Sequence, residues 1–287
     1  MNELKLYVST GAFIGRVNGR NPRPFLSIAP TLVCDGFELM LYEAWYEKLS
    51  EILDLFLSSS LSFPVLHVEK GVGEIIGAGE ANFARRASER FEINCRAAKT
   101  VGAEKLVFHL WNGIPSDRAF DRHLDACGEF LAIADSYGLS LTVENVVAVS
   151  ASPLAHLLSL AERYPALKFT FDTKMASFHR ETEAIFRPEY APLRAAISHL
   201  HINDHKGEYM DFSSLRTLHI GEGIIDFDRF FRGLSEMAYQ NSMTLECTSM
   251  CADGSLAPEK MNMSIERVRQ LTRLYITKEE RTNEHGK

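Results

Sequence analysis

Histidine and carboxylate residues recur along this chain at the ends of short β-rich segments. In sequence order they are His67, His109, Glu144, Asp172, His199, His201, His219 and Glu246. Imidazole and carboxylate groups together suit divalent cations such as Mn, Zn, Co or Mg. One histidine on an apolar strand is usually a hydrogen-bonded core residue, but buried carboxylates are costly unless they are paired or bound to a cation. A shared divalent metal would remove these costs together, so the pattern predicts a metal site.

The segments that must position these residues alternate between strand and helix patterns. Segments of helical period, such as 37–57, have apolar residues at the i, i+3 and i+4 spacing of one buried stripe. Ser152 with Pro153, and Asp226, are expected to begin helices as N-terminal caps. Eight β-rich runs are expected as strands: 4–9, 63–68, 104–109, 139–144, 167–172, 198–203, 216–220 and 243–247.

Eight strands alternating with helices predict an α/β fold, a (β/α)8 TIM barrel that forms a single domain over residues 1–277. An open doubly wound sheet would usually carry a glycine-rich phosphate loop after its first strand, and STGAFIGRVNGR (9–20) lacks that spacing. The charged segment 278–287 has no apolar face and is expected to be a tail. In such a barrel the C-terminal ends of the strands meet at one face, where the polar residues would share a site.

Composition excludes several classes of protein. Apolar residues make up 46% and charged residues 24% of the chain, as in ordinary soluble domains. No run approaches the ~18 apolar residues of a membrane span, and charges at Glu3 and Lys5 argue against a signal peptide. The five cysteines lack CxxC spacing, which favours reduced thiols and a cytoplasmic protein. The net charge of −7 argues against a nucleic-acid partner, because affinity for the phosphate backbone depends on clustered Lys and Arg.

Five motifs, each expected at a successive strand end, resemble the xylose isomerase-like barrel superfamily. They are LTVEN, FDT, HLHINDHKG, HIGEGIIDF and TLE. This superfamily includes sugar isomerases and epimerases, inositol-pathway isomerases and endonuclease IV. The resemblance implies that one divalent metal is held by Glu144, Asp172, His201 and Glu246. His199 shares a strand face with His201 but is expected to be a core or neighbouring residue.

The sugar-isomerase arm of the superfamily implies an isomerase or epimerase of a sugar, sugar phosphate or polyol-derived ketose. The reaction would proceed by proton transfer through a metal-stabilised enediolate. Glu246 is expected to act as the base and Glu144 as its partner, with the reverse assignment open. The expected partner is a small sugar molecule, and a homodimer is possible. The residues expected to contact substrate are His67, His109, His219 and Lys206.

The endonuclease IV arm implies an alternative, a metal-dependent phosphodiesterase. His67, His109 and Glu144 stand where that family binds its first metal, so a second metal is possible. Met175 replaces a histidine ligand of the third metal, and 215–217 (LRT) lacks two further ligands. Sugar epimerases also carry a histidine at the position of Met175, a role that His179 would fill only by folding back. A non-catalytic ligand-binding barrel is the third hypothesis.

Three loop features could shape the substrate pocket. The arginines of 16–23 could recognise an anionic group, although surface solubility explains them as well. The glycine-rich segment 69–80 is expected to form a lid that excludes water from the barrel mouth. Trp111 could stack on a sugar face or simply pack in its loop.

Overall fold

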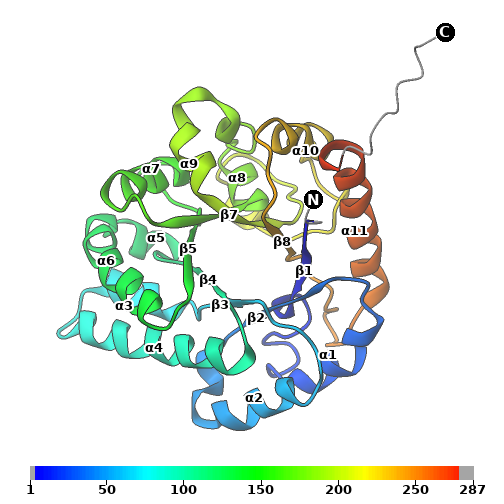
Figure 1. Cartoon of the computed structure of the whole chain (residues 1–287), viewed down its shortest axis with the longest axis horizontal. Coiled ribbons are helices and arrows are strands. Elements are labelled where there is room, and N and C mark those ends of the chain that lie inside the picture. Colours follow the sequence, from blue (N-terminus) through cyan, green and yellow to red (C-terminus); the bar gives the residue numbers. More distant parts are fainter. Residues whose placement is uncertain (1–3, 278–287) are drawn as a thin grey trace.

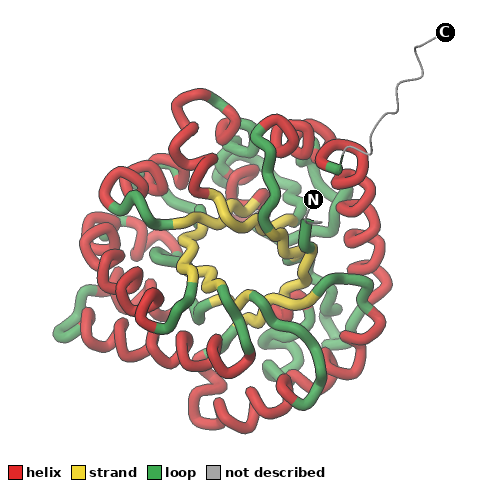
Figure 2. Tube along the Cα trace, viewed as in Figure 1, coloured by secondary structure: helices red, strands yellow, loops and turns green. Residues whose placement is uncertain are grey.

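Short apolar segments in this chain pair side by side until they close on themselves. In the computed structural model, which describes residues 4–277, eight parallel strands form a closed barrel in sequential order (Figures 1 and 2). Closure places Tyr7 of the first strand beside Thr244 of the last. The strands are β1 (Leu6–Ser9), β2 (Gly36–Met40), β3 (Val65–His67), β4 (Lys105–Phe108), β5 (Ser140–Glu144), β6 (Lys168–Asp172), β7 (Ile197–Ile202) and β8 (Ser242–Leu245).

Helices form a ring outside the barrel and cover the apolar outer faces of the strands (Figure 1). The expected caps are confirmed: Ser152 Oγ accepts from Ala155 N at 3.2 Å, and Asp226 Oδ1 accepts from Arg229 N at 2.9 Å. The helices are α1 (Pro22–Ile28), α2 (Leu49–Leu57), α3 (Gly71–Ala78), α4 (Phe83–Val101), α5 (Gly113–Asp117), α6 (Phe120–Ser136), α7 (Pro153–Arg163), α8 (Thr173–Phe178), α9 (Ala191–Ala196), α10 (Phe227–Glu236) and α11 (Pro258–Leu271).

The predicted (β/α)8 barrel is confirmed as a single domain, and the tail expected over 278–287 lies outside the described residues. None of the helices in the described range is long and apolar enough to cross a membrane.

The prediction of one helix over 37–57 was wrong at its start. Residues Gly36–Met40 form β2, which pairs with both β1 and β3, and the helix begins only at Leu49. Every residue of β2 is buried, so its apolar side chains fit a helical period as well as a strand. The misread strand carries Glu38, which lies inside the barrel against His199 and His201.

The strand predicted at 216–220 was also wrong. Within that segment only Leu218 makes a β-bridge, an isolated antiparallel one to Asp204. Both residues belong to the long connection between β7 and β8, in which the Asp204 carboxylate accepts from Gly221 N and Gly223 N at 2.9 Å. The barrel therefore has its eight strands because β2 replaces this segment.

Candidate metal centre

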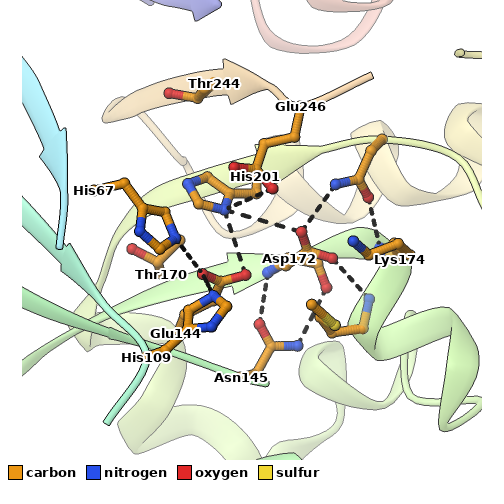
Figure 3. Close-up of polar contacts among 12 residues, drawn as sticks. His67, His109, Glu144, Asn145, Thr170, Asp172, Lys174, His201, Thr244 and Glu246 are labelled. Carbon is orange, nitrogen blue, oxygen red and sulfur yellow. Dashed lines mark hydrogen bonds and ion pairs between the residues drawn. The ribbon is translucent and has the colours of Figure 1, made fainter. Parts of the chain in front are cut away.

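Four side chains from consecutive strand ends converge at the C-terminal face of the barrel (Figure 3). Glu144 ends β5, Asp172 ends β6, His201 lies on β7, and Glu246 directly follows β8. His201 Nδ1 lies 3.4 Å from Glu144 Oε1, 3.6 Å from Glu246 Oε2 and 3.9 Å from Asp172 Oδ2. One potential ligand atom from each residue lies within 4.8 Å of the other three. We call these four residues the candidate metal centre.

The donor set of the candidate metal centre fits a divalent cation. Glu144 Oε1 and His201 Nδ1 are buried and have no hydrogen-bond partner in the described part of the chain. Buried polar atoms without hydrogen-bond partners are costly. Here the two atoms lie 3.4 Å from each other, and Glu246 Oε2 lies 3.6 Å from His201 Nδ1. Three carboxylates with one imidazole form a hard donor set, which Mn, Mg, Co or Zn can accept.

Electrostatics lead to the same conclusion. Burial alone would lower the pKa of His201, but Glu246, Glu38 and Glu144 around it hold that pKa well above its ordinary value. Burial, together with the charges of Glu144 and Glu246, raises the pKa of Asp172 to about 6. In the metal-free protein, protons thus offset crowded negative charge. A divalent cation would neutralise this charge directly.

Hydrogen bonds hold Asp172 in place. Asn203 Nδ2 donates to Asp172 Oδ2 at 2.9 Å, and Met175 N donates to Asp172 Oδ1 at 2.7 Å. Asn145 Oδ1 accepts from the backbone N of Asp172 at 2.6 Å. Asp172 thereby caps α8 while keeping its carboxylate directed at the centre. Met175, where the resemblance implied a histidine, contributes its backbone N to this cap and does not line the cavity above the centre.

Glu38 is the residue of this site that sequence reasoning missed. Its Oε2 accepts from His201 Nε2 at 3.2 Å and from Thr244 Oγ1 at 2.8 Å. A carboxylate behind a histidine ligand fixes the ring orientation and makes the opposite nitrogen a better donor to a metal. His199 also contacts Glu38 Oε2, at 3.2 Å, so it lies beside the centre as expected. A glutamate alternating with Phe37 and Leu39 would have been the signal, had that segment been read as a strand.

His67 and His109 lie against the other side of Glu144 (Figure 3). His109 Nε2 lies 2.8 Å and His67 Nε2 lies 3.5 Å from Glu144 Oε2. His67 Nδ1 faces the backbone oxygen of Val68 at 2.9 Å, so Nδ1 carries the proton. His67 Nε2 is the ring nitrogen that faces the carboxylate oxygen of Glu144.

Both ring nitrogens of His109 face hydrogen-bond acceptors, Glu144 Oε2 and Asn112 Oδ1. Its Nδ1 lies 3.3 Å from Asn112 Oδ1, and the amide orientation is set because Asn112 Nδ2 donates to Glu74 at 2.6 Å. Burial lowers the pKa of His109 to about 4, although Glu144 raises it, so the ring is neutral and has one N–H for two acceptors. A cation between His67, His109 and Glu144 would resolve this conflict, and the three residues meet the spacing of a metal site.

A cavity of about 790 Å³ opens above the candidate metal centre, a size that suits a small-molecule ligand. Glu246, with 15% of its side chain exposed, is the member of the centre that lines it. Arg16 and Arg20 from the loop after β1 also line it, as do Lys174 and Thr217.

None of the four residues expected at the substrate, His67, His109, His219 and Lys206, lines this cavity. His67 and His109 are buried against Glu144. Lys206 is exposed, and His219 is held by Ser264 Oγ at 2.9 Å and by the backbone oxygen of Thr248 at 3.1 Å. His179 accepts from Ala148 N at 3.2 Å and does not take the place left by Met175. The lysines that line the cavity are Lys70 and Lys174.

Two features expected to act at the substrate pocket, Trp111 and the segment 69–80, are packed into the protein instead. Trp111 is fully buried and donates from Nε1 to Val146 O at 3.2 Å, so it packs in its loop rather than stacking in the cavity. The segment expected as a lid forms α3, with Val72 and Ile76 buried. Glu74 of this helix lines the cavity.

Comparisons with known proteins agree with this architecture. The chain is 15% identical to an L-ribulose 3-epimerase structure, with a TM-score of 0.70 over 99% of this chain and 100% of that one. It is 15% identical to D-allulose 3-epimerase from Methylomonas sp. in complex with D-allulose (TM-score 0.69, 94% and 98% covered). It is also 15% identical to the IOLI protein with a bound zinc atom (TM-score 0.69, 96% and 100% covered).

At the level of sequence, no curated protein matches the chain. A family model described as "Xylose isomerase-like TIM barrel" matches residues 29–271, which is most of the chain. The closed eight-stranded barrel agrees with that match. The chain therefore belongs to the xylose isomerase-like TIM barrel family.

Proposed function

We propose that this protein is a divalent-metal-dependent isomerase or epimerase of a sugar, sugar phosphate or polyol-derived ketose. The observation that carries the proposal is the convergence of Glu144, Asp172, His201 and Glu246 beneath a ligand-sized cavity. The structural neighbours titled as sugar 3-epimerases support the same class of reaction. The bound cation would act as a Lewis acid, polarising the substrate carbonyl and making the neighbouring C–H more acidic.

Glu246 is the proposed base. Its carboxylate is the part of the centre that is accessible from the cavity, so a substrate C–H can approach it. Its Oε2 lies 3.6 Å from His201 Nδ1, which leaves the second oxygen for a proton. General-base catalysis of this kind requires contact with the transferred proton, and Glu246 is the member of the candidate metal centre that is open to such contact from the cavity.

Glu144 is the proposed partner in proton transfer. Its carboxylate is fully buried, with Oε1 facing His201 Nδ1 and Oε2 facing His109 Nε2. A proton that reaches Glu144 therefore has a neighbouring imidazole that can share it. This asymmetry favours Glu246 as the residue that removes the proton from substrate and Glu144 as the residue that helps to return one.

The proposal is tested by proton exchange. The metal-loaded protein is incubated in deuterated water with a panel of pentoses, hexoses and inososes, and deuterium at the carbon beside the carbonyl is measured by NMR. Deuterium incorporation with conversion to an isomer is expected for at least one ketose. Sugar binding without any exchange would favour a non-catalytic ligand-binding barrel.

His67, His109 and Glu144 support a second candidate, a two-cation phosphodiesterase. A protein holding two metals per chain is expected to fall to one in the His67→Ala/His109→Ala variant, because the Glu144 centre keeps its four ligands. Metal content is measured by mass spectrometry on protein purified without a histidine tag, together with cleavage of DNA containing an abasic site. One metal in both proteins and no cleavage would remove this candidate.

Glu38 gives a prediction for metal affinity. Glu38→Gln is expected to weaken metal binding by about 10- to 100-fold, because His201 loses the charged acceptor that orients it. Competition with a chromophoric chelator measures the affinity. Thr142→Val is the matched control, since Thr142 is another polar residue inside the barrel but bonds Thr170 and Leu106 rather than His201. Equal affinities for both variants would contradict a positioning role for Glu38.

A further inference from the structure

The cavity above the candidate metal centre has more unpaired positive than negative charge on its wall. Its cationic lining residues are Arg16, Arg20, Lys70 and Lys174. Among residues 4–277, none of these four has a carboxylate oxygen within 4.0 Å of its charged nitrogen atoms, whereas Arg90 outside the lining has two.

The acidic lining residues are engaged. Arg90 lies 3.1 Å from Glu43 Oε1 and 2.5 Å from Glu69 Oε1, and Glu74 Oε1 accepts from Asn112 Nδ2 at 2.6 Å. Glu246 belongs to the candidate metal centre. The Asn112 amide is neutral, so Glu74 keeps its charge. Apart from the candidate metal centre, the wall therefore carries four cations and one carboxylate without an oppositely charged partner within 4.0 Å among the residues that the structure describes, and the balance is positive.

Lys174 is the most buried of these cations, with only 9% of its surface exposed. It lies two residues after Asp172, and its backbone N donates to Asn203 Oδ1 at 2.9 Å, which anchors the start of α8. Its Nζ donates to Thr217 Oγ1 at 3.1 Å. An ammonium group has three donors, and burying it beside one neutral hydroxyl is costly unless an anion also binds there.

We propose that Lys174 and Thr217 form a subsite for an anionic group, a phosphate or a carboxylate, carried by the molecule that binds at the candidate metal centre. The inference rests on the proposed function and narrows its substrate class to acidic or phosphorylated ketoses. Lysine suits this role because its compact charge binds phosphate and carboxylate oxygens from several directions. Lys174 and Thr217 line the same cavity as Glu246 of the candidate metal centre, so one small molecule in the cavity can contact both.

The competing role for Lys174 is to balance the negative charge of the candidate metal centre through Asp172. The two roles differ in what they affect. Charge balance would change the affinity for the metal and would affect charged and neutral ligands alike. An anion subsite would change the preference for charged over neutral ligands while the protein keeps its metal.

The test uses three small ketones that share a hydroxy-ketone group: dihydroxyacetone, dihydroxyacetone phosphate and hydroxypyruvate. Their binding to the metal-loaded full chain is measured by calorimetry. We expect at least one charged ketone to bind at least tenfold more tightly than dihydroxyacetone. The charged ketone that binds more tightly identifies the anionic group, phosphate or carboxylate, that the subsite takes. Lys174→Met is expected to abolish that preference and leave dihydroxyacetone binding in place, whereas Lys174→Arg is expected to retain most of it.

Lys168→Met is the matched control, because Lys168 is an exposed lysine at the opposite end of the same strand, β6. Equal binding of all three ketones to the parent, or a preference that survives in Lys174→Met, would overturn the inference. If Lys174→Met loses both the preference for charged ketones and the bound metal, Lys174 balances the charge of the candidate metal centre instead, and the inference is overturned. Should none of the three ketones bind, the proton-exchange panel decides the proposed function, and inorganic phosphate tests the subsite alone. Phosphate binding that Lys174→Met removes would support the subsite, and no phosphate binding would overturn it.

Discussion

Glu246→Gln is expected to reduce turnover by about 10²- to 10⁴-fold while the protein stays folded. The amide has nearly the shape of the carboxylate but cannot accept the substrate proton, and the metal loses one negative ligand. The loss should appear in kcat for any ketose that the parent converts, and in the rate of deuterium incorporation from solvent. Thermal unfolding checks that the variant keeps its structure.

The matched control for this variant is Glu259→Gln. Glu259 is an exposed glutamate in the first turn of α11 and does not line the cavity, so the same chemical change there should leave the rate near that of the parent. Near-normal turnover by Glu246→Gln would rule out Glu246 as the base. Glu144 would then be the first residue to test in its place.

The second large effect is expected from the Glu144→Ala/Asp172→Ala variant. The parent should bind about one Mn, Co, Mg or Zn per chain at the candidate metal centre, and the variant none, because two of the four ligands are gone. Metal content after gel filtration is measured by mass spectrometry on protein without a histidine tag. The variant should also lose stability, since the partners of Asp172, which include Asn203 Nδ2 and Met175 N, are left unsatisfied in the interior.

Asp253→Ala/Glu259→Ala serves as the control, because it removes two carboxylates that are exposed on the surface. It should retain the parental metal content. A parent that holds no metal under any loading condition would mean that the cluster is structural. Metal retained by the Glu144→Ala/Asp172→Ala variant would move the binding site elsewhere.

Much of the candidate metal centre could be anticipated because its geometry follows from a simple rule. Glu144 and Asp172 end neighbouring parallel strands, and Glu246 directly follows the last one. In a closed barrel the C-terminal ends of all strands meet at one face, so ligand types at those ends must lie near one another. Even two wrongly assigned segments, 37–57 and 216–220, left this conclusion intact, because neither carried one of the four residues.

Glu38 could not be found in the same way. A strand buried on both faces has no polar alternation, so a helix and a strand fit its apolar residues equally well. Only pairing with β1 and β3 decides the matter, and with it the direction of the Glu38 side chain into the barrel. The alternation of Glu38 with Phe37 and Leu39 becomes a signal only once the segment is known to be a strand, and its contact with His201 lies far away in the chain.

The sequence by itself determined the barrel class and the order of the strand-end residues, and its resemblance to the superfamily selected the four side chains that meet as the candidate metal centre. Only the tertiary structure decided which of two lysines that follow strand ends, Lys174 or Lys206, lines the cavity. Lys206 and Lys174 both follow strand ends, yet the first is exposed and the second is buried beside Thr217. Strand ends follow the regular geometry of the barrel. A side chain beyond a strand end takes its direction from distant contacts, such as that of Asn203 with the backbone of Lys174 at the start of α8.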